Sequence, residues 1–338
     1  MSFDRAKPFA EAITGAHMGP TPSWARSLEV LPWREHPLFT GAVVSGRRSP
    51  LRQSALNKRC LSRQGPDRRS LKMNRTTEDL AASFATSQGV EALVLAGSMT
   101  SGLADEGSDY DLHAYTREAV PLEFRARLLK PRAARLELHN TFFEWSDEWI
   151  EPDGTVFDLM YRSCDLIEAD VEARLGRGEG AVGYSTCLCH SVLQAQPVFD
   201  RQGWFRALQD RLKAAPYPDR LVTGIIQRNL PLLGANIHSY EHQIRSAFRR
   251  RDRVSLNHRT AAWLASYFDI LFAANRRFNP GEKRLLVQVQ ALPTAPEEVA
   301  ADAEAACTGA CSLDRCVVDH LERMRTRLER FLRIQGLL

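Results

Sequence analysis

The sequence predicts an α+β fold in which a small mixed-sheet domain precedes a helical bundle domain. Up to about residue 203, short apolar or alternating runs of strand length are interspersed with single helical segments. Beyond that point, apolar residues recur with the helical period to the end of the chain. We therefore predict three segments: a leader at 1–75, a sheet domain at 76–203 and a helical domain at 204–338.

The first 75 residues differ in composition from the rest. They contain 14 basic and 5 acidic residues, a net charge of +9, and 7 of the 17 prolines. This segment has no sustained strand or helix period. It therefore cannot bury enough apolar surface to offset the conformational entropy lost on folding, and we expect it to be disordered. The other 263 residues carry 31 basic and 36 acidic groups, so the body of the protein is acidic. Met73 directly precedes the first patterned element, which suggests the hypothesis that the natural chain starts there.

The predicted sheet domain opens with a helix that starts near Thr76. Residues 90–96 form a short apolar run typical of a buried strand. Residues 109–115 alternate between apolar and polar side chains, which predicts a second strand. A further helix is expected over 122–130, where a proline follows the periodic pattern.

Three more strands are indicated, over 136–145, 155–161 and 188–199, with a Glu-Pro-Asp-Gly turn before the second of them. The sheet would then have four or five strands. Cys187 and Cys189 would share one face of the last strand, where thiols commonly pack. Neither they nor the other five cysteines have the spacing of a zinc site or a disulfide framework.

The remaining half of the chain predicts helices. Helical periodicity covers residues 204–214, 221–250, 256–278 and 313–334. In the last of these, apolar residues step by four and three and predict the seam of a packed helix: Val317, Leu321, Met324, Leu328 and Phe331. No apolar run reaches the roughly 18 residues of a membrane span, and the N-terminus lacks a signal-peptide core, so we expect a cytoplasmic protein with no membrane partner.

Acidic residues with a chemical pattern follow the first two predicted strands. Gly97-Ser98 ends the first strand, and Asp109-x-Asp111 opens the second after a loop of ten residues. Residues i and i+2 of a strand point to one face, so these two carboxylates would lie together. Two like charges held that close need a compensating cation. We expect Mg²⁺, because it prefers oxygen ligands and bridges carboxylates to substrate phosphates.

Asp158 is the natural third carboxylate. It stands alone in an apolar strand, where an acid is unfavourable unless a charge pairs with it. If its strand neighbours that of Asp109 and Asp111, three carboxylates converge and two Mg²⁺ ions fit the site. Gly97 would let the backbone approach a phosphate, and Ser98 with nearby N–H groups would hold triphosphate oxygens.

The pattern of Gly-Ser, a ten-residue loop, Asp-x-Asp and a later strand aspartate resembles the nucleotidyltransferase superfamily of DNA polymerase β. Within it, the chain is similar to the bacterial branch that includes kanamycin and lincosamide nucleotidyltransferases, in which a small sheet domain precedes a helical domain. Residues 275–284 (Asn-Arg-Arg-Phe-Asn-Pro-Gly-Glu-Lys-Arg) resemble a segment of uncharacterised helical domains that follow bacterial nucleotidyltransferase domains. The resemblance covers roughly residues 78–290.

The resemblance implies a function and a role for each residue. Gly97 and Ser98 match the nucleotide-binding turn, Asp109 and Asp111 the metal-binding pair, and Asp158 the third catalytic carboxylate. The implied reaction transfers a nucleoside monophosphate from a nucleoside triphosphate, with ATP as the expected donor, to a hydroxyl of a small-molecule or protein acceptor. Pyrophosphate is released. The sheet domain would bind the nucleotide, and the helical domain would bind the acceptor substrate.

Other polar residues are weaker candidates. Lys283 is expected to reach the triphosphate as a point charge. Asn275 lies on an apolar helical stripe and would either contact the nucleotide or cap a backbone. Arg162 would meet a phosphate or lie on a solvated face. Glu241, His242 or the third carboxylate itself could act as general base, although ordinary helix-surface polarity also explains the first two.

Two alternative functions follow from the same residues. An RNA-modifying nucleotidyltransferase would need a basic track, for which residues 245–253 are the candidate, but the acidic body disfavours a nucleic-acid partner. A non-catalytic nucleotide sensor or toxin–antitoxin component is the second alternative, and the presence of all three carboxylates disfavours it. These residues do not specify the acceptor, the preferred nucleobase of the triphosphate, the residue that acts as general base or the oligomeric state.

Overall fold

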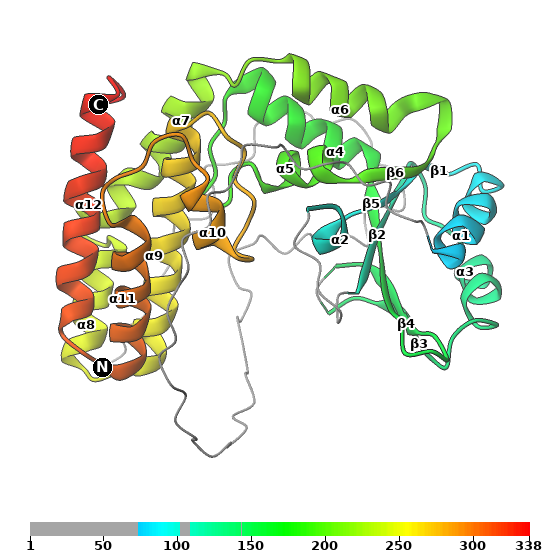
Figure 1. Ribbon diagram of the computed structural model, residues 1–338, viewed down its shortest axis with the longest axis horizontal. Helices are drawn as coiled ribbons and strands as arrows, with labels where there is room; N and C mark the ends of the chain where they lie inside the picture. Colours follow the sequence, from blue (N-terminus) through cyan, green and yellow to red (C-terminus); the bar gives the residue numbers. More distant parts are fainter. Residues whose placement is uncertain (1–73, 102–108, 143) are drawn as a thin grey trace, which may run out of the picture. The chain divides into compact units, whose positions relative to one another are not determined.

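A computed structural model of the protein describes residues 74–101, 109–142 and 144–338, so the predicted leader lies almost wholly outside the described residues (Figure 1). The described chain forms a six-stranded mixed sheet followed by a helical region, which confirms the α+β prediction. The strands are β1 (Val90–Leu95), β2 (Tyr110–Thr116), β3 (Arg135–Asn140), β4 (Ser146–Ile150), β5 (Val156–Ser163) and β6 (Gln196–Asp200).

The strand order is β3-β4-β5-β2-β1-β6, with β2 and β5 parallel and the other neighbours antiparallel. Helices cover both faces of the sheet. Those of the first half are α1 (Arg75–Ala85), α2 (Gly97–Ser101), α3 (Leu122–Leu129), α4 (Cys164–Val171), α5 (Cys187–Gln194) and α6 (Trp204–Ala214), with a π-helical segment at Glu172–Arg177 and a 3₁₀ turn at Arg201–Gly203. One face packs with α1 and α3, and the other with α4, α5 and α6.

Strand β4 was not predicted from the sequence, and the strand expected over 136–145 ends earlier, at Asn140. The reason is composition, because two of the buried residues of β4 are the polar Ser146 and Asp147. Asp147 is satisfied inside the protein: its carboxylate accepts hydrogen bonds from Arg125 at 2.9 Å and from the Tyr161 hydroxyl at 2.8 Å. These hydrogen bonds make the buried carboxylate stable in the strand. The sequence of β4 therefore lacks the apolar pattern that predicts a buried strand.

The prediction of a strand over 188–199 is wrong in its first half. Residues Cys187–Gln194 form helix α5, and only Gln196–Asp200 forms a strand. Cys189 and Val192, three positions apart, face the core. Over so short an apolar run, the helical and strand periods cannot be distinguished from sequence.

The C-terminal half is helical, as predicted. Its helices are α7 (Asp219–Leu230), α8 (Tyr240–Arg249), α9 (Arg253–Ala274), α10 (Leu285–Gln290), α11 (Val299–Ser312) and α12 (Cys316–Ile334), with a π-helical turn at Pro231–Ala235. The helix expected over 221–250 is two helices, because Pro231 ends the first and Ser239 caps the second. The alanine-rich α11 was missed, since its apolar residues form no clear stripe.

Helices α8, α9, α11 and α12 run side by side (Figure 1) and enclose one continuous apolar core. All five residues of the predicted seam on α12 are buried there. Helix α6, by contrast, packs through Phe205, Leu208 and Leu212 with the sheet, so the boundary predicted at residue 203 remains a prediction. Within the described residues, no helix combines the length and apolar character that crossing a membrane requires.

Candidate active site

Carboxylates of neighbouring strands lie in one row across the sheet. Asp111 of β2 is the register partner of Asp158 of β5, and Asp158 is in turn the register partner of Glu148 of β4. Residues paired directly across neighbouring strands project to the same face. Asp158 therefore lies on the same side of the sheet as Asp111, and Asp109 stands two residues before Asp111, just ahead of the strand. The structure thus brings the predicted aspartates to one end of β2 and β5.

The row brings carboxylates close enough together to repel one another. Burial, and then the charges of Glu148, Asp111, Asp109 and Glu144, raise the pKa of Asp158 to about 7. Burial and the charge of Asp109 also raise the pKa of Asp111. The Oδ1 atom of Asp158 is buried and, among the described residues, has no hydrogen-bond partner. A bound cation would relieve both the repulsion and the unpaired oxygen.

Gly97 packs directly against Asp111. Its φ is +65°, and a Cβ added there would lie 1.7 Å from Oδ2 and 2.6 Å from Cγ of Asp111. The backbone N–H of Ala96 also donates to the carbonyl of Asp111 at 2.8 Å. The Gly-Ser turn therefore borders the carboxylate row as predicted from the motif, although the side chain of Ser98 lies outside the described residues.

Two basic residues act on the row. The charges of Lys283 and Arg162 lower the pKa of Asp111, against the larger effects of burial and Asp109. Arg162 is not on a solvated face: its side chain is only 14% exposed and makes a bidentate ion pair with Glu144, at 3.0 and 3.1 Å. Lys283 is solvent-exposed, so its ammonium is available to a triphosphate.

Asn275 caps a backbone, which was one of its two predicted roles. Its Nδ2 donates to the carbonyl of Leu271 at 2.9 Å, and its Oδ1 accepts from the backbone and the hydroxyl of Thr294, at 3.1 and 3.0 Å. The side chain thus closes the end of α9 and fixes the following loop. Its predicted contact with a nucleotide remains a prediction.

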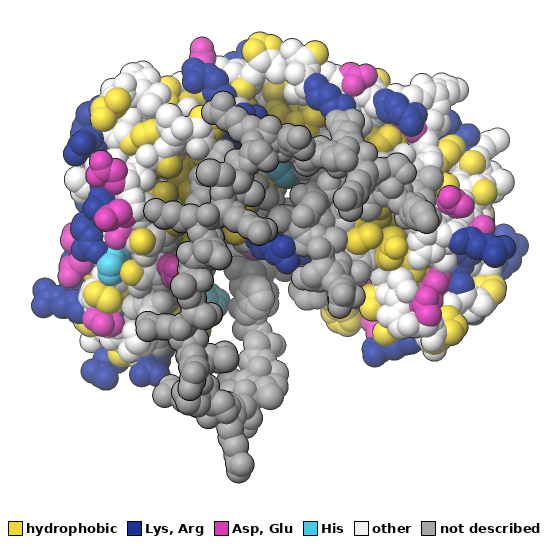
Figure 2. Space-filling model, in the orientation of Figure 1, with side chains coloured by type: hydrophobic (Ala, Val, Ile, Leu, Met, Phe, Trp, Pro, Cys, Tyr) yellow, Lys and Arg dark blue, Asp and Glu magenta, His cyan; other side chains and the backbone are white. Residues whose placement is uncertain are grey.

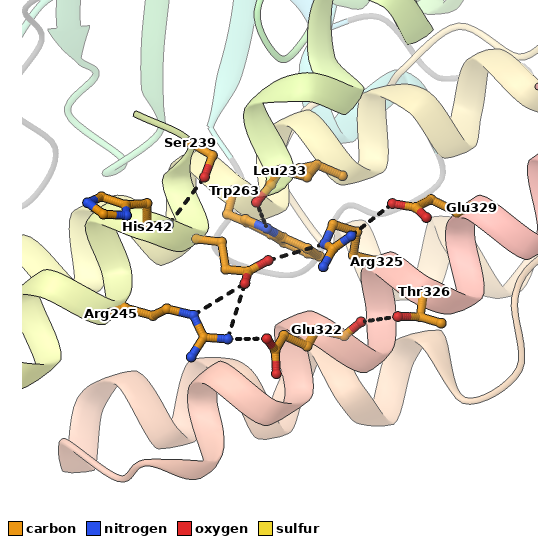
Figure 3. A network of polar contacts seen from close by, with 10 residues as sticks. Leu233, Ser239, His242, Arg245, Trp263, Glu322, Arg325, Thr326 and Glu329 are labelled. Carbon is orange, nitrogen blue, oxygen red and sulfur yellow. Dashed lines mark hydrogen bonds and ion pairs between the residues drawn. The ribbon is translucent and has the colours of Figure 1, made fainter. Parts of the chain in front are cut away.

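The structure does not favour Glu241 or His242 as the general base. Glu241 lies between α8 and α12, where it accepts from Arg245 at 3.2 Å and from Arg325 at 3.1 Å. Figure 3 shows Arg245 also facing Glu322 of α12. Glu241 is only 9% exposed, so ordinary surface polarity does not describe it either. The backbone N–H of His242 donates to the hydroxyl of Ser239, the N-cap residue of α8, at 3.3 Å.

Glu148 is a functional candidate that sequence reasoning missed. Its Oε1 accepts from Nδ2 of Asn140 at 2.8 Å and from the hydroxyl of Ser146 at 3.2 Å, which orients the carboxylate next to Asp158. The sequence did not indicate this position. Counting outward from the predicted turn at 151–154 would pair Glu148 with Phe157, one residue short of its actual partner Asp158.

The residues fit an open cation site with few protein ligands rather than a closed metal cage. In the part of the chain that the structure describes, no three acidic, histidine or cysteine side chains are spaced to hold one ion. Mg²⁺ usually takes one or two carboxylates and completes its shell with phosphate oxygens and water. The unpaired oxygen of Asp158 and the repulsion felt by Asp111 and Asp158 are what such an ion would offset.

Comparison with known proteins adds little to this geometry. No protein-family model matches the chain, and a search of curated proteins finds no match. A solved complex of CCA-adding enzyme with CTP aligns with 76% of this chain and 71% of its own, at 13% sequence identity and a TM-score of 0.23. At that level of similarity, the function has to be argued from the site itself.

Proposed function

We propose that the protein is a metal-dependent nucleotidyltransferase, which transfers a nucleoside monophosphate from a nucleoside triphosphate to a hydroxyl acceptor. The observation that carries the proposal is Asp158, a carboxylate with a buried unpaired oxygen in register between Asp111 and Glu148. A buried carboxylate without a partner lowers the stability of the fold. Such a residue is expected where the protein binds a cation or another charged group. The proposal includes a relationship to kanamycin and lincosamide nucleotidyltransferases, which the sequence motif resembles.

Each residue has a role in the proposed reaction. Asp109, Asp111 and Asp158 would hold two Mg²⁺ ions, each on one or two of these carboxylates, and the bound ions would neutralise the triphosphate charge and increase the acidity of the acceptor hydroxyl. Gly97 leaves room for the Asp111 carboxylate and for a phosphate, and Lys283 adds positive charge.

The acceptor proton needs a base, and Glu148 is placed for it. In the proposed step, the acceptor oxygen bonds to the α-phosphorus, the bond to the pyrophosphate oxygen breaks, and the hydroxyl proton passes to the Glu148 carboxylate. Pyrophosphate leaves. ATP is the expected donor, and the acceptor is a small molecule or a protein.

An RNA acceptor has less support. Arg245, the first residue of the candidate basic track, is paired with Glu241 and Glu322. Along α12, at the left of Figure 2, acidic and basic side chains are interspersed rather than forming one positive surface. RNA tracking needs a continuous basic groove with aromatic stacking partners.

The proposal is tested by pyrophosphate release from each nucleoside triphosphate in the presence of Mg²⁺. The variant Asp109→Ala/Asp111→Ala should release pyrophosphate about 10³-fold more slowly or worse, because charge neutralisation is the main catalytic effect in phosphoryl transfer. A matched control, Asp210→Ala/Asp319→Ala, removes two exposed acids and should leave the rate unchanged. Full activity in the first variant would exclude these aspartates. Label from an α-labelled triphosphate, followed into small molecules, protein or RNA, identifies the acceptor class.

Glu148→Gln should lower kcat by about 10² to 10⁴-fold while the KM for the triphosphate stays close to the wild-type value, as expected for loss of a general base. The matched control is Glu137→Gln, since Glu137 is the next acid in the same row, on the exposed edge strand β3. An equal loss in both variants would mean that Glu148 contributes only negative charge and is not the base.

A further inference from the structure

A buried carboxylate on α9 organises the loop that carries Lys283. Asp269 lies on α9 and is 1% exposed. It accepts hydrogen bonds from the backbone and the hydroxyl of Ser185, the former at 2.9 Å, and from Nδ2 of Asn279 at 3.1 Å. A longer contact of 3.5 Å comes from Asn229 of α7. Three separate segments of the chain thus meet at one side chain.

Asn279 connects Asp269 to the loop that carries Lys283. It is 1% exposed, its backbone N–H donates to the hydroxyl of Thr186 at 2.8 Å, and its Oδ1 accepts from the backbone of Gly281 at 3.0 Å. Backbone and side chain are therefore both fixed. Gly281 then turns the chain with a φ of +94°, and Lys283 follows two residues later.

The anchored loop lies near the carboxylate row. Thr186 immediately precedes α5, and α5 packs against α2, whose first residue is Gly97. Gly97 in turn contacts the carboxylate of Asp111. The loop anchored by Asp269 is therefore linked through α5 and α2 to the proposed metal-binding residues, and the charge of Lys283 acts on Asp111.

The chemistry of Asp269 is unusual for a packing residue. Its neighbours Phe268, Ile270 and Leu271 are apolar and buried, and all of its hydrogen bonds to described residues come from uncharged donors. A buried carboxylate without a bonded cation is destabilising compared with an apolar side chain. What Asp269 provides in return is a fixed position for two loops.

We propose that Asp269 is a positioning residue, which acts through Asn279 to hold residues 279–283 so that Lys283 binds the triphosphate. This inference rests on the proposed function. It predicts that the contribution of Asp269 to nucleotide binding depends on the presence of Lys283. A purely structural role predicts independent effects instead.

The test is a double-mutant cycle on the affinity for a non-hydrolysable ATP analogue with Mg²⁺, measured by calorimetry on the full chain. Lys283→Ala should raise Kd about tenfold, as loss of one charge-assisted contact does. Asp269→Asn should raise Kd by a similar factor. The variant Asp269→Asn/Lys283→Ala should bind no more weakly than Lys283→Ala alone. Effects that multiply to about a hundredfold would overturn the inference.

Two further variants make the test robust. Asn279→Ala breaks the same connection, replaces Asp269→Asn if that variant does not fold, and should give the same non-additivity with Lys283→Ala. Asn229→Ala is the matched control, because it removes a contact to Asp269 but none to the 279–283 loop, and its effect should be additive with Lys283→Ala. If the wild type binds no triphosphate, the proposed function fails; if it binds but the cycle is additive, only this inference fails.

Discussion

Replacing Gly97 with alanine should slow pyrophosphate release by about 10²-fold or more. The new Cβ would lie 1.7 Å from Oδ2 of Asp111, so the carboxylate must move by more than an ångström or the turn must open. A displacement of about 1 Å in a catalytic constellation can reduce the rate by 10²-fold. Activity and Mg²⁺-dependent triphosphate binding should both be measured, and both should fall.

Gly203→Ala is the matched control for this variant. Gly203 has a similar left-handed φ, +76°, but a Cβ there would meet nothing within 4 Å. Both alanines carry the backbone strain of about 1–2 kcal/mol that a left-handed residue with a Cβ incurs. Only the Gly97 variant should lose activity. Equal activity in the two variants would show that Gly97 does not set the position of Asp111.

Replacing Asp158 with asparagine should abolish activity and yet stabilise the metal-free protein at pH 8. The ionised carboxylate lies among Glu148, Asp111 and Asp109 with one oxygen unpaired, so removing its charge relieves repulsion. Because the side chain is partly solvent-exposed, we expect a gain of about 1–2 kcal/mol in the free energy of unfolding, well below what the full pKa shift would give. Thermal unfolding of the metal-free proteins measures it.

The same pKa fixes the direction of the pH dependence. The folded-state pKa of Asp158, about 7, lies above its ordinary value of 3.8, so the folded protein retains this proton longer than the unfolded chain. Stability associated with the protonated form is therefore lost as the pH rises from about 4 to 7. The melting temperature of the metal-free wild type should fall over this range more steeply than that of Asp158→Asn.

Addition of Mg²⁺ tests whether repulsion between the carboxylates causes the difference in stability between the wild type and Asp158→Asn. At pH 8, Mg²⁺ should raise the melting temperature of the wild type, and chelation should reverse the increase. In Asp158→Asn, the Mg²⁺-induced increase should be much smaller. A variant that is less stable than the wild type at pH 8 without metal would contradict the placement of Asp158 among like charges.

The elements that were predicted well from the sequence are those whose buried residues are apolar. Strand β1 is a plain apolar run, and α12 repeats its apolar residues with one period, so both were located closely. Strand β4 and helix α11 were missed for opposite reasons. In β4 the buried residues include Asp147, whose carboxylate is held by Arg125 and Tyr161 of other elements, and in α11 alanines surround the helix without marking a face.

The site divides in the same way. Gly97, Asp109 and Asp111 are close in sequence, and their spacing alone indicated that they belong together. Assigning Asp158 required only that its strand pair with theirs, which the register confirms. Glu148 and Asp269 gave no comparable signal, because their roles follow from contacts that exist only in the folded chain: Glu148 with its register partner Asp158, and Asp269 with the backbone of Ser185. Tertiary contacts of this kind are not encoded in local spacing.

The parallel pairing of β2 with β5 affects how the protein reaches its working form. Asp111 and Asp158 are 47 positions apart, and a parallel pair cannot close through a hairpin, so β3, β4 and α3 make up the crossover. Contacts of such sequence separation form slowly, after local ones such as the β4–β5 hairpin. During biosynthesis, the proposed cation site therefore forms only after the intervening chain has folded, and until then Asp111 and Asp158 are separate, solvated acids in the nascent chain.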